Sequence, residues 1–209
     1  MSVFKPTGTT DALIKAIKPH IKGGELLDLA CGSGIVGASL WKDIDFDQVY
    51  ASDISPEAIK MVQNKYPYIE ARCGNLFEPW LGMAFDYIVD DVSGVAEDIA
   101  TISPWFDGVP CASGKDGADL VCDVLSQAHL YLEENGTLFF PIVSLSNVER
   151  IKDTASKLWK LELLSHTDFP LPKDIPIEIL EGHGKYGIEF KEKFGMVLFY
   201  TDIYKATFR

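Results

Sequence analysis

The sequence predicts an α/β protein built on a doubly wound, mostly parallel sheet. Short apolar runs with strand character alternate with amphipathic helical runs along most of the 209 residues. A glycine-rich turn follows the first of these strands, and ligands bind such sheets beyond the carboxyl ends of the strands. We expect one domain over 1–209, in which 1–22 form an N-terminal helical extension.

The elements of the first half follow from apolar periodicity and from end signals. Thr9-Thr10-Asp11 offers a helix start, and apolar residues at helical spacing continue to Pro19. Ser55 and Pro56 provide the cap and first residue of another helix. Strands are predicted at 25–29, 48–52, 68–73 and 85–89, and a crossover helix at 35–41. This alternation implies parallel strands joined by right-handed crossovers.

The second half carries weaker signals. Residues 94–117 are rich in Gly, Pro, Ser and Asp, so we expect a long functional loop, and we expect a mobile connection at 181–187. An amphipathic helix is expected at 118–132, closed by Asn135-Gly136. Strands are predicted at 137–143, 161–164 and 196–204, and a helix at 147–159. No helix is evident between the last two strands, which predicts an antiparallel edge pair.

Composition narrows the class of protein. With 47% hydrophobic and 24% charged residues, the chain can bury a sizeable core, and its net charge of -12 disfavours a nucleic-acid partner. The four cysteines form no C-x-x-C pair and have no histidine at zinc spacing, so no metal site is expected. We find no signal peptide and no apolar run long enough for a membrane, and we expect a cytoplasmic protein.

The strand at 25–29 leads into a glycine turn with a carboxylate just before it. Gly32, Gly34 and Gly37 have the G-x-G-x-x-G spacing, which by itself predicts a dinucleotide. Asp28 argues against one, because a carboxylate facing the loop would repel a pyrophosphate and attract an ammonium group. The nucleoside cofactor with an amino-acid ammonium is S-adenosylmethionine.

Two later residues extend this pattern. Asp53 ends the second strand, where a carboxylate accepts hydrogen bonds from ribose hydroxyls; its alternative role is to cap the helix that begins after Ser55. Asn75 follows the third strand, where an amide can contact an adenine edge while Leu76 packs on its face. The alternative for Leu76 and Phe77 is a turn with an apolar anchor.

Asp28 to Gly37, Asp53 and Gly74-Asn75 resemble the first three motifs of class I S-adenosylmethionine-dependent methyltransferases. Ala30 stands where that family commonly has glycine. The resemblance implies a Rossmann-like seven-stranded sheet with an antiparallel last strand. It also implies S-adenosylmethionine as cofactor, with Asp28 near the methionine ammonium and Asp53 on the ribose. The cofactor-binding residues expected on this basis are Asp28, Ala30, Cys31, Gly32, Gly34, Asp53, Ile54, Asn75, Leu76 and Asp90.

A narrower resemblance connects the chain to the release-factor glutamine methyltransferases. It rests on Phe4 to Asp11, Phe85 to Val89 and Pro110 to Leu120. In that family an Asn-Pro-Pro-Tyr motif after the fourth strand binds the planar nitrogen to be methylated. Here the corresponding residues are Asp91-Val92-Ser93-Gly94, so the preference for a planar nitrogen does not carry over. Only a short stretch precedes the first strand, and we expect that family's release-factor-recognition domain to be lacking.

Asp90 and Asp91 are the candidate catalytic residues. A carboxylate beside the methyl group could accept a proton from the acceptor or orient a cationic substrate. Adjacent residues leaving a strand point in different directions, so we expect at most one of them to face the pocket. The alternative is a pair of solvated loop carboxylates or a helix cap. His129, His166 and His183 are weaker candidates, and Trp105 and Phe106 are either a substrate wall or a core anchor.

The leading hypothesis is an S-adenosylmethionine-dependent methyltransferase. The expected acceptor is a small molecule or a protein side chain rather than nucleic acid. One alternative is an NAD-dependent oxidoreductase, which shares the glycine spacing and Asp53 but leaves Asp28 unexplained. Another is a catalytically silent cofactor-binding partner subunit, which would account for the missing Asn-Pro-Pro-Tyr. The sequence does not indicate an oligomeric state.

Overall fold

The computed structural model describes residues 3–92, 94–109 and 111–209, and the side chains of His183 and Lys185 are not described within it. Ser93 and Pro110, which belong to the motifs quoted above, lie outside the described residues. The helices are α1 (Gly8–Ile17), α2 (Ile35–Trp41), α3 (Pro56–Lys65), α4 (Glu97–Ile102), α5 (Asp119–Gln127), α6 (Val148–Ser156) and α7 (Ile177–His183). The strands are β1 (Gly24–Leu29), β2 (Phe46–Asp53), β3 (Ile69–Cys73), β4 (Phe85–Asp90), β5 (Leu132–Val143), β6 (Trp159–Pro170), β7 (Lys191–Lys193) and β8 (Met196–Phe208).

The described strands form one sheet in the order β3-β2-β1-β4-β5-β8-β6, with the short β7 paired to β8. Strands β1 to β5 run parallel to one another, whereas β8 runs antiparallel to both β5 and β6. The mostly parallel, doubly wound sheet with a reversed strand at one side is therefore confirmed. The added strand β7 makes eight strands instead of seven, which is a small extension of the same topology.

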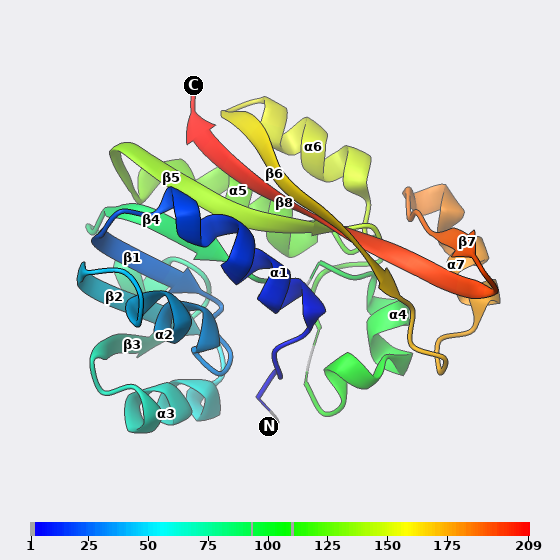
Figure 1. Ribbon diagram of the computed structural model, residues 1–209, viewed down its shortest axis with the longest axis horizontal. Coiled ribbons are helices and arrows are strands. Elements are labelled where there is room, and N and C mark those ends of the chain that lie inside the picture. Colours follow the sequence, from blue (N-terminus) through cyan, green and yellow to red (C-terminus); the bar gives the residue numbers. More distant parts are fainter. Residues whose placement is uncertain (1–2, 93, 110) are drawn as a thin grey trace.

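Helices cover both faces of the sheet (Figure 1). Leu13 and Ile17 of α1, with Val36 of α2 and Val62 of α3, pack with β1 and β2 in one apolar cluster. On the other face, residues of α5 and α6 pack with β4, β5 and β8 in a second cluster. Both clusters are rich in fully buried Leu, Ile, Val and Phe, as expected for parallel strands that are covered on both sides.

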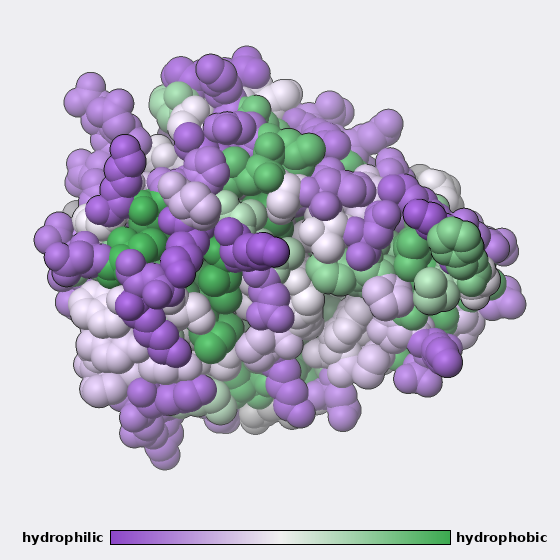
Figure 2. All heavy atoms as spheres, in the orientation of Figure 1, coloured by the Kyte–Doolittle hydropathy of each residue, from purple (hydrophilic) through white to green (hydrophobic). Residues whose placement is uncertain are grey.

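A third apolar cluster lies beyond the carboxyl ends of β4 and β5. It combines α4 and Phe106 with Leu145, the region around α7 and Phe199 of the long strand β8. In Figure 1 this part projects from the sheet together with β7. Figure 2 shows mainly polar side chains over the sheet's α1 face and apolar ones near the β7–β8 turn, where Phe194 is 88% exposed. This third cluster encloses one side of the edge at which ligands bind such sheets.

Several predicted boundaries were wrong in the second half. The expected loop 94–117 contains α4, whose Ile99 and Ala100 are buried, and the expected mobile connection 181–187 is helical in α7 and a following 3-10 turn. Gly136 does not close a helix, because it lies within β5 next to an irregularity in the β4–β5 register. Strand β6 extends over 12 residues since it pairs with β8 along its whole length. These segments are fixed by contacts with distant residues rather than by local end signals.

Helix starts in the first half follow local chemistry. The Ser55 hydroxyl accepts a hydrogen bond from the Ala58 N–H, and Pro56 is the first residue of α3, as predicted. Helix α1 begins slightly earlier than expected, at Gly8, with Thr7 and Thr10 forming a capping box. Among the described residues, no helix has the length and apolar character needed to cross a membrane.

Candidate functional site

The glycine turn after β1 is held by backbone hydrogen bonds at the carboxyl edge of the sheet. The Cys31 N–H donates to Ser52 O at 2.9 Å, and the Gly34 N–H donates to Cys31 O at 2.7 Å. Gly34 has φ of +71°, and a Cβ there would lie 2.8 Å from Cγ2 of Val62. A glycine is therefore required at this position both for its backbone conformation and for close packing of the turn on α3.

Ala30 adopts a left-handed conformation with φ of +54°. This is the position at which the resembled family commonly has glycine, and the turn forms here in spite of the methyl group. A non-glycine residue in this region costs about 1–2 kcal/mol. The departure from the family motif is thus accommodated as local backbone strain, in a turn that the surrounding hydrogen bonds hold in place.

Asp28 is buried beneath the glycine turn, with 1% of its surface exposed. Its Oδ2 accepts a hydrogen bond from the Gly37 N–H at 2.8 Å, while its Oδ1 is buried with no partner among the described residues. Burial, with smaller contributions from the nearby carboxylates of Asp91, Asp53 and Asp90, raises the pKa of Asp28 to about 8 against the opposing effect of the Gly37 hydrogen bond. The free oxygen is a group that a bound cation would satisfy.

Asp53 connects the glycine turn to the end of β2. Its Oδ2 accepts from the Gly32 N–H at 2.9 Å, and its Oδ1 accepts from the Ser55 N–H at 2.8 Å. The cap of α3 is Ser55 itself, so Asp53 supports the turn that precedes this helix. Each of its oxygens keeps acceptor capacity for a hydroxyl group, because a carboxylate has about four acceptor sites. Ile54 beside it is 70% exposed and free to contact a ligand.

The segment after β3 lies next to Asp53. The Gly74 N–H donates to Asp53 O at 3.1 Å, and the Ser52 hydroxyl donates to Leu76 O at 3.2 Å. Asn75 is exposed, whereas Phe77 is buried in the core and acts as the apolar anchor. The structure therefore brings Asp28, the glycine turn, Asp53 and Asn75 to one edge of the sheet. Their contacts with a cofactor remain predictions.

Asp90 and Asp91 have separate hydrogen-bond partners, as expected for adjacent residues leaving a strand. Asp90 is fully buried; its Oδ1 accepts from the Val92 N–H at 3.0 Å, and its Oδ2 has no described partner. The Oδ2 of Asp91 accepts from the Thr10 hydroxyl at 2.8 Å. Burial raises the pKa of Asp90 to about 8 and that of Asp91 to about 7. Both carboxyl groups can thus change protonation state near neutral pH.

The N-terminal segment contributes residues that the site prediction missed. Besides the bond from Thr10 to Asp91, the backbone of Phe4 approaches the glycine turn, because a Cβ on Gly32 would lie 3.5 Å from Phe4 O. The Phe4 ring packs on Phe106, with 5.2 Å between centroids. The signal that could have identified these residues is the Phe4-to-Asp11 motif, which was used only to support the resemblance.

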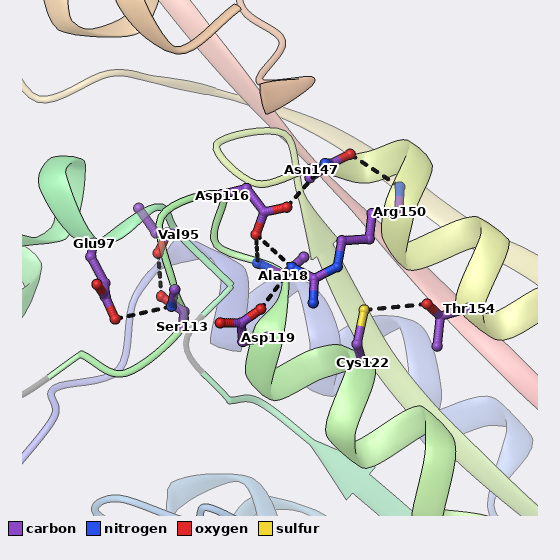
Figure 3. A network of polar contacts seen from close by, with 11 residues as sticks. Val95, Glu97, Ser113, Asp116, Ala118, Asp119, Cys122, Asn147, Arg150 and Thr154 are labelled. Atoms are coloured by element: carbon purple, nitrogen blue, oxygen red, sulfur yellow. Dashed lines mark hydrogen bonds and ion pairs between the residues drawn. The ribbon is translucent and has the colours of Figure 1, made fainter. Parts of the chain in front are cut away.

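The segment after Asp91 is held by contacts with distant parts of the chain. The Ala96 N–H donates to Leu145 O at 3.0 Å, and the Ser113 hydroxyl donates to Val95 O. Figure 3 shows how the adjoining loop is fixed in turn: Asp116 accepts from the Asn147 side chain at 3.0 Å and from Arg150 at 2.9 Å. This network connects the start of α5 to the start of α6 and supports the loop that follows β4.

The remaining candidates from the sequence are placed away from this edge or in the core. Phe106 is buried, and Trp105 packs against Phe199 at 5.3 Å, so both belong to the third apolar cluster. His129 stacks on Phe208 near the C-terminus. His166, for which no partner was expected, has its Nδ1 2.5 Å from Oδ1 of Asp202. The side chain of His183 lies outside the described residues.

The polar groove of this protein lies away from the carboxyl edge of the sheet. It has a volume of about 870 Å³ and lies at the opposite edge, lined by residues that include His20, Glu25, Asp86 and Lys205. Ligands bind open α/β sheets at the carboxyl ends of their strands, so we assign the site to that edge. Within the described ranges, no group of three or more His, Cys, Asp or Glu side chains is arranged to hold a metal ion.

Comparisons with known proteins find similar sequences and a similar fold. Residues 5–91 match the family model of the Methyltransferase small domain. The release factor glutamine methyltransferase of Clostridium acetobutylicum is 26% identical over 68% of this chain and 55% of its own length. The ribosomal RNA small subunit methyltransferase C of Haemophilus influenzae is 26% identical over 62% of this chain and 35% of its own. The chain thus spans about half or less of the length of these curated relatives.

A solved structure gives the same fold. The N-methyltransferase NodS of Bradyrhizobium japonicum, crystallised with S-adenosylhomocysteine, superposes with a TM-score of 0.56 at 11% identity, covering 95% of this chain and 85% of that one. The matched residues 5–91 include the glycine turn and the acidic residues at the ends of β1 and β2. Together these comparisons support a class I S-adenosylmethionine-dependent methyltransferase near the release factor glutamine methyltransferase group.

Proposed function

We propose that the protein binds S-adenosylmethionine and transfers its methyl group to a small molecule or a protein side chain. The observation that carries this proposal is the buried, unpartnered Oδ1 of Asp28 directly below the glycine turn. S-adenosylmethionine brings a sulfonium and an ammonium group, both cationic, whereas a dinucleotide would bring the negative charge of a pyrophosphate to the same carboxylates. The charge of the site thus favours S-adenosylmethionine over NAD.

The residues present fit this cofactor. Asp28 would bind the ammonium group of the cofactor. The backbone around Ala30, Cys31, Gly32 and Gly34 would surround the methionine part. Asp53 and Ile54 would hold the ribose, and Asn75 and Leu76 would hold the adenine, with Asp90 beside the sulfonium. When bound, the cofactor supplies an electrophilic methyl group on sulfur. The chain's own part of the reaction is to align the acceptor and to take its proton, and Asp91 is the residue we assign to this role.

The proposal also specifies the class of methyl acceptor. The two curated relatives described above carry names that refer to a release factor glutamine and to ribosomal RNA, which are different acceptors. Here Asp91 replaces the amide side chain expected in the first group, and the net charge of -12 opposes nucleic acid. Both observations favour a small molecule or a protein side chain.

Calorimetry with S-adenosylhomocysteine and with NAD tests the cofactor. We expect S-adenosylhomocysteine to bind and NAD not to bind, and the reverse result would overturn the proposal. The transfer is tested with a tritiated methyl donor and a panel of small molecules, proteins and RNA. Asp91→Asn should keep the affinity for S-adenosylhomocysteine and reduce turnover, and an undiminished rate would remove Asp91 from the mechanism.

A further inference from the structure

Four carboxylates gather where β1, β2 and β4 end: Asp28, Asp53, Asp90 and Asp91. In the sheet register Leu29 pairs with Asp90 on one side and with Ser52 on the other, so the four residues lie within one or two positions of the same sheet edge. Among the described residues, no lysine or arginine contributes to the pKa of Asp90 or of Asp91. This edge of the sheet is therefore acidic, and no described basic side chain offsets Asp90 or Asp91.

Two of these carboxylates have an oxygen that is buried without a partner, Oδ1 of Asp28 and Oδ2 of Asp90. Both residues are at most 1% exposed. A buried carboxyl oxygen without a partner is costly, and each of these two oxygens is a group that a bound cation would satisfy. S-adenosylmethionine carries one net positive charge, because its carboxylate offsets one of its two cationic groups. Its ammonium and sulfonium groups are assigned above to Asp28 and Asp90, so Asp91 is the carboxylate left without a cationic partner.

Asp91 is the carboxylate that is best placed for a second cation. Its side chain is half-buried, and the Thr10 hydroxyl fixes its Oδ2. No described residue donates a hydrogen bond to its Oδ1. It also occupies the position at which the related group has an asparagine, whose amide offers a neutral oxygen to a planar nitrogen. Exchanging that amide for a carboxylate adds a negative charge and removes two donors, which changes the preferred partner from an amide to a cation.

We propose that the methyl acceptor is a primary aliphatic amine, which arrives as an ammonium ion and is held by Asp91. This inference rests on the proposed methyltransferase function and specifies its substrate class. A hydroxyl or an amide acceptor would leave Asp91 without a cationic partner. An ammonium group instead pairs with Asp91 in a partly desolvated site, where such charged hydrogen bonds are strong. The net charge of -12 also attracts cationic substrates over a longer range.

The proton balance of the transfer follows from this arrangement. The bound ammonium gives one proton to the Asp91 carboxylate and becomes a neutral amine with a free electron pair. The amine nitrogen then forms a bond to the methyl carbon as the bond between that carbon and sulfur breaks. The products are S-adenosylhomocysteine and a protonated N-methylamine, and Asp91 returns its proton to solvent before the next cycle.

The test uses three probes of equal chain length that differ in their head groups: hexylamine, hexanol and hexanamide. Each is titrated by calorimetry into the protein saturated with S-adenosylhomocysteine at pH 7.5. We expect hexylamine to bind at least tenfold more tightly than the other two. A second arm replaces hexylamine with a capped tripeptide that presents a lysine side chain, and this arm distinguishes a free amine from a protein side chain as the source of the same chemistry.

Two variants test whether Asp91 causes the preference for hexylamine. Asp91→Asn should abolish the advantage of hexylamine while still binding S-adenosylhomocysteine, which also shows that the variant is folded. Asp123→Asn, an exposed carboxylate on α5, should leave the preference unchanged. Equal binding of the three probes, no detectable binding, or a preference for hexanol or hexanamide would overturn the inference while leaving cofactor binding intact. Failure to bind S-adenosylhomocysteine would instead overturn the proposed function.

Discussion

The proposed cofactor side of this site consists of Asp28, the glycine turn and Asp53, and the proposed acceptor side consists of Asp91 and the loop after it. The two sides are built by different means. On the cofactor side the hydrogen bonds of the glycine turn and Asp53 join residues at most 21 positions apart, as in Gly37 to Asp28 and Gly32 to Asp53. On the acceptor side the contacts join more distant segments, as in Ala96 to Leu145 and Thr10 to Asp91. The cofactor side is thus specified within one stretch of the first half of the sequence, and the acceptor side depends on the packing of the whole chain. The acceptor side can therefore change its chemistry while the cofactor motif stays recognisable.

The largest effect should come from breaking the packing of the acceptor side at Gly117. This residue has φ of +73°, and a Cβ would lie 2.6 Å from the Ala96 backbone nitrogen and 2.7 Å from the Val95 carbonyl carbon. Gly117→Ala should lower the free energy of unfolding by about 3 kcal/mol, through left-handed strain and a clash with rigid backbone. Urea unfolding measures this loss.

The matched control is Gly82→Ala. Gly82 has φ of +80°, and a Cβ there would meet nothing within 4 Å. This variant should lose only about 1 kcal/mol, from backbone strain alone. Equal losses in the two variants would show that the contact of the loop with Val95 and Ala96 adds nothing, and that the acceptor side is held elsewhere.

The same contrast explains which parts of the structure could be predicted from the sequence. The glycine turn, Asp53 and the Ser55 cap lie in segments whose conformation is determined by nearby residues, and they were placed correctly. The third apolar cluster was missed because α4 is short and is stabilised by burial of Ile99 against distant residues. The hydrogen bond between Thr10 and Asp91 joins residues 81 positions apart, and no local pattern indicates it.

A smaller effect is expected on the cofactor side at Asp53. Asp53→Ala removes the acceptor for the Gly32 and Ser55 N–H groups as well as the expected ribose contact. The free energy of binding of S-adenosylhomocysteine, measured by calorimetry, should become less favourable by about 1–3 kcal/mol. Asp47→Ala, an exposed carboxylate near the other end of β2, should leave the affinity unchanged. If Asp53→Ala also binds normally, Asp53 only supports the turn.

The next largest effect is expected in the pH dependence of the free energy of unfolding, through the buried carboxyl groups of the site. In the folded state the pKa is about 8 for Asp28 and Asp90 and about 7 for Asp91, above the ordinary value of 3.8. Between the ordinary pKa of an aspartate and its raised pKa in the folded state, the folded state binds more protons than the unfolded state. The free energy of unfolding should therefore fall as the pH rises from 5 to 8. Asp90→Asn should reduce this fall by about 1–2 kcal/mol.

The control for this pH effect is Asp123→Asn, whose carboxylate is exposed. It should lose the same amount of stability between pH 5 and 8 as the unmodified protein does, as measured by urea unfolding at each pH. A stability that rises over this interval would mean that Asp28 and Asp90 are charged throughout and paired with a cation that the described residues do not supply.

The smallest effect is expected at Ala30, where the cofactor motif departs from the family pattern. Ala30→Gly removes left-handed strain of about 1–2 kcal/mol, and the greater freedom of glycine in the unfolded chain offsets part of this, so stability should rise by about 0.5–1 kcal/mol. Ala12→Gly, within α1, should instead lose about 1 kcal/mol. If Ala30→Gly gains stability and the affinity for S-adenosylhomocysteine is unchanged, glycine at this position serves backbone conformation alone. A changed affinity would mean that the Ala30 methyl group itself helps to shape the cofactor side.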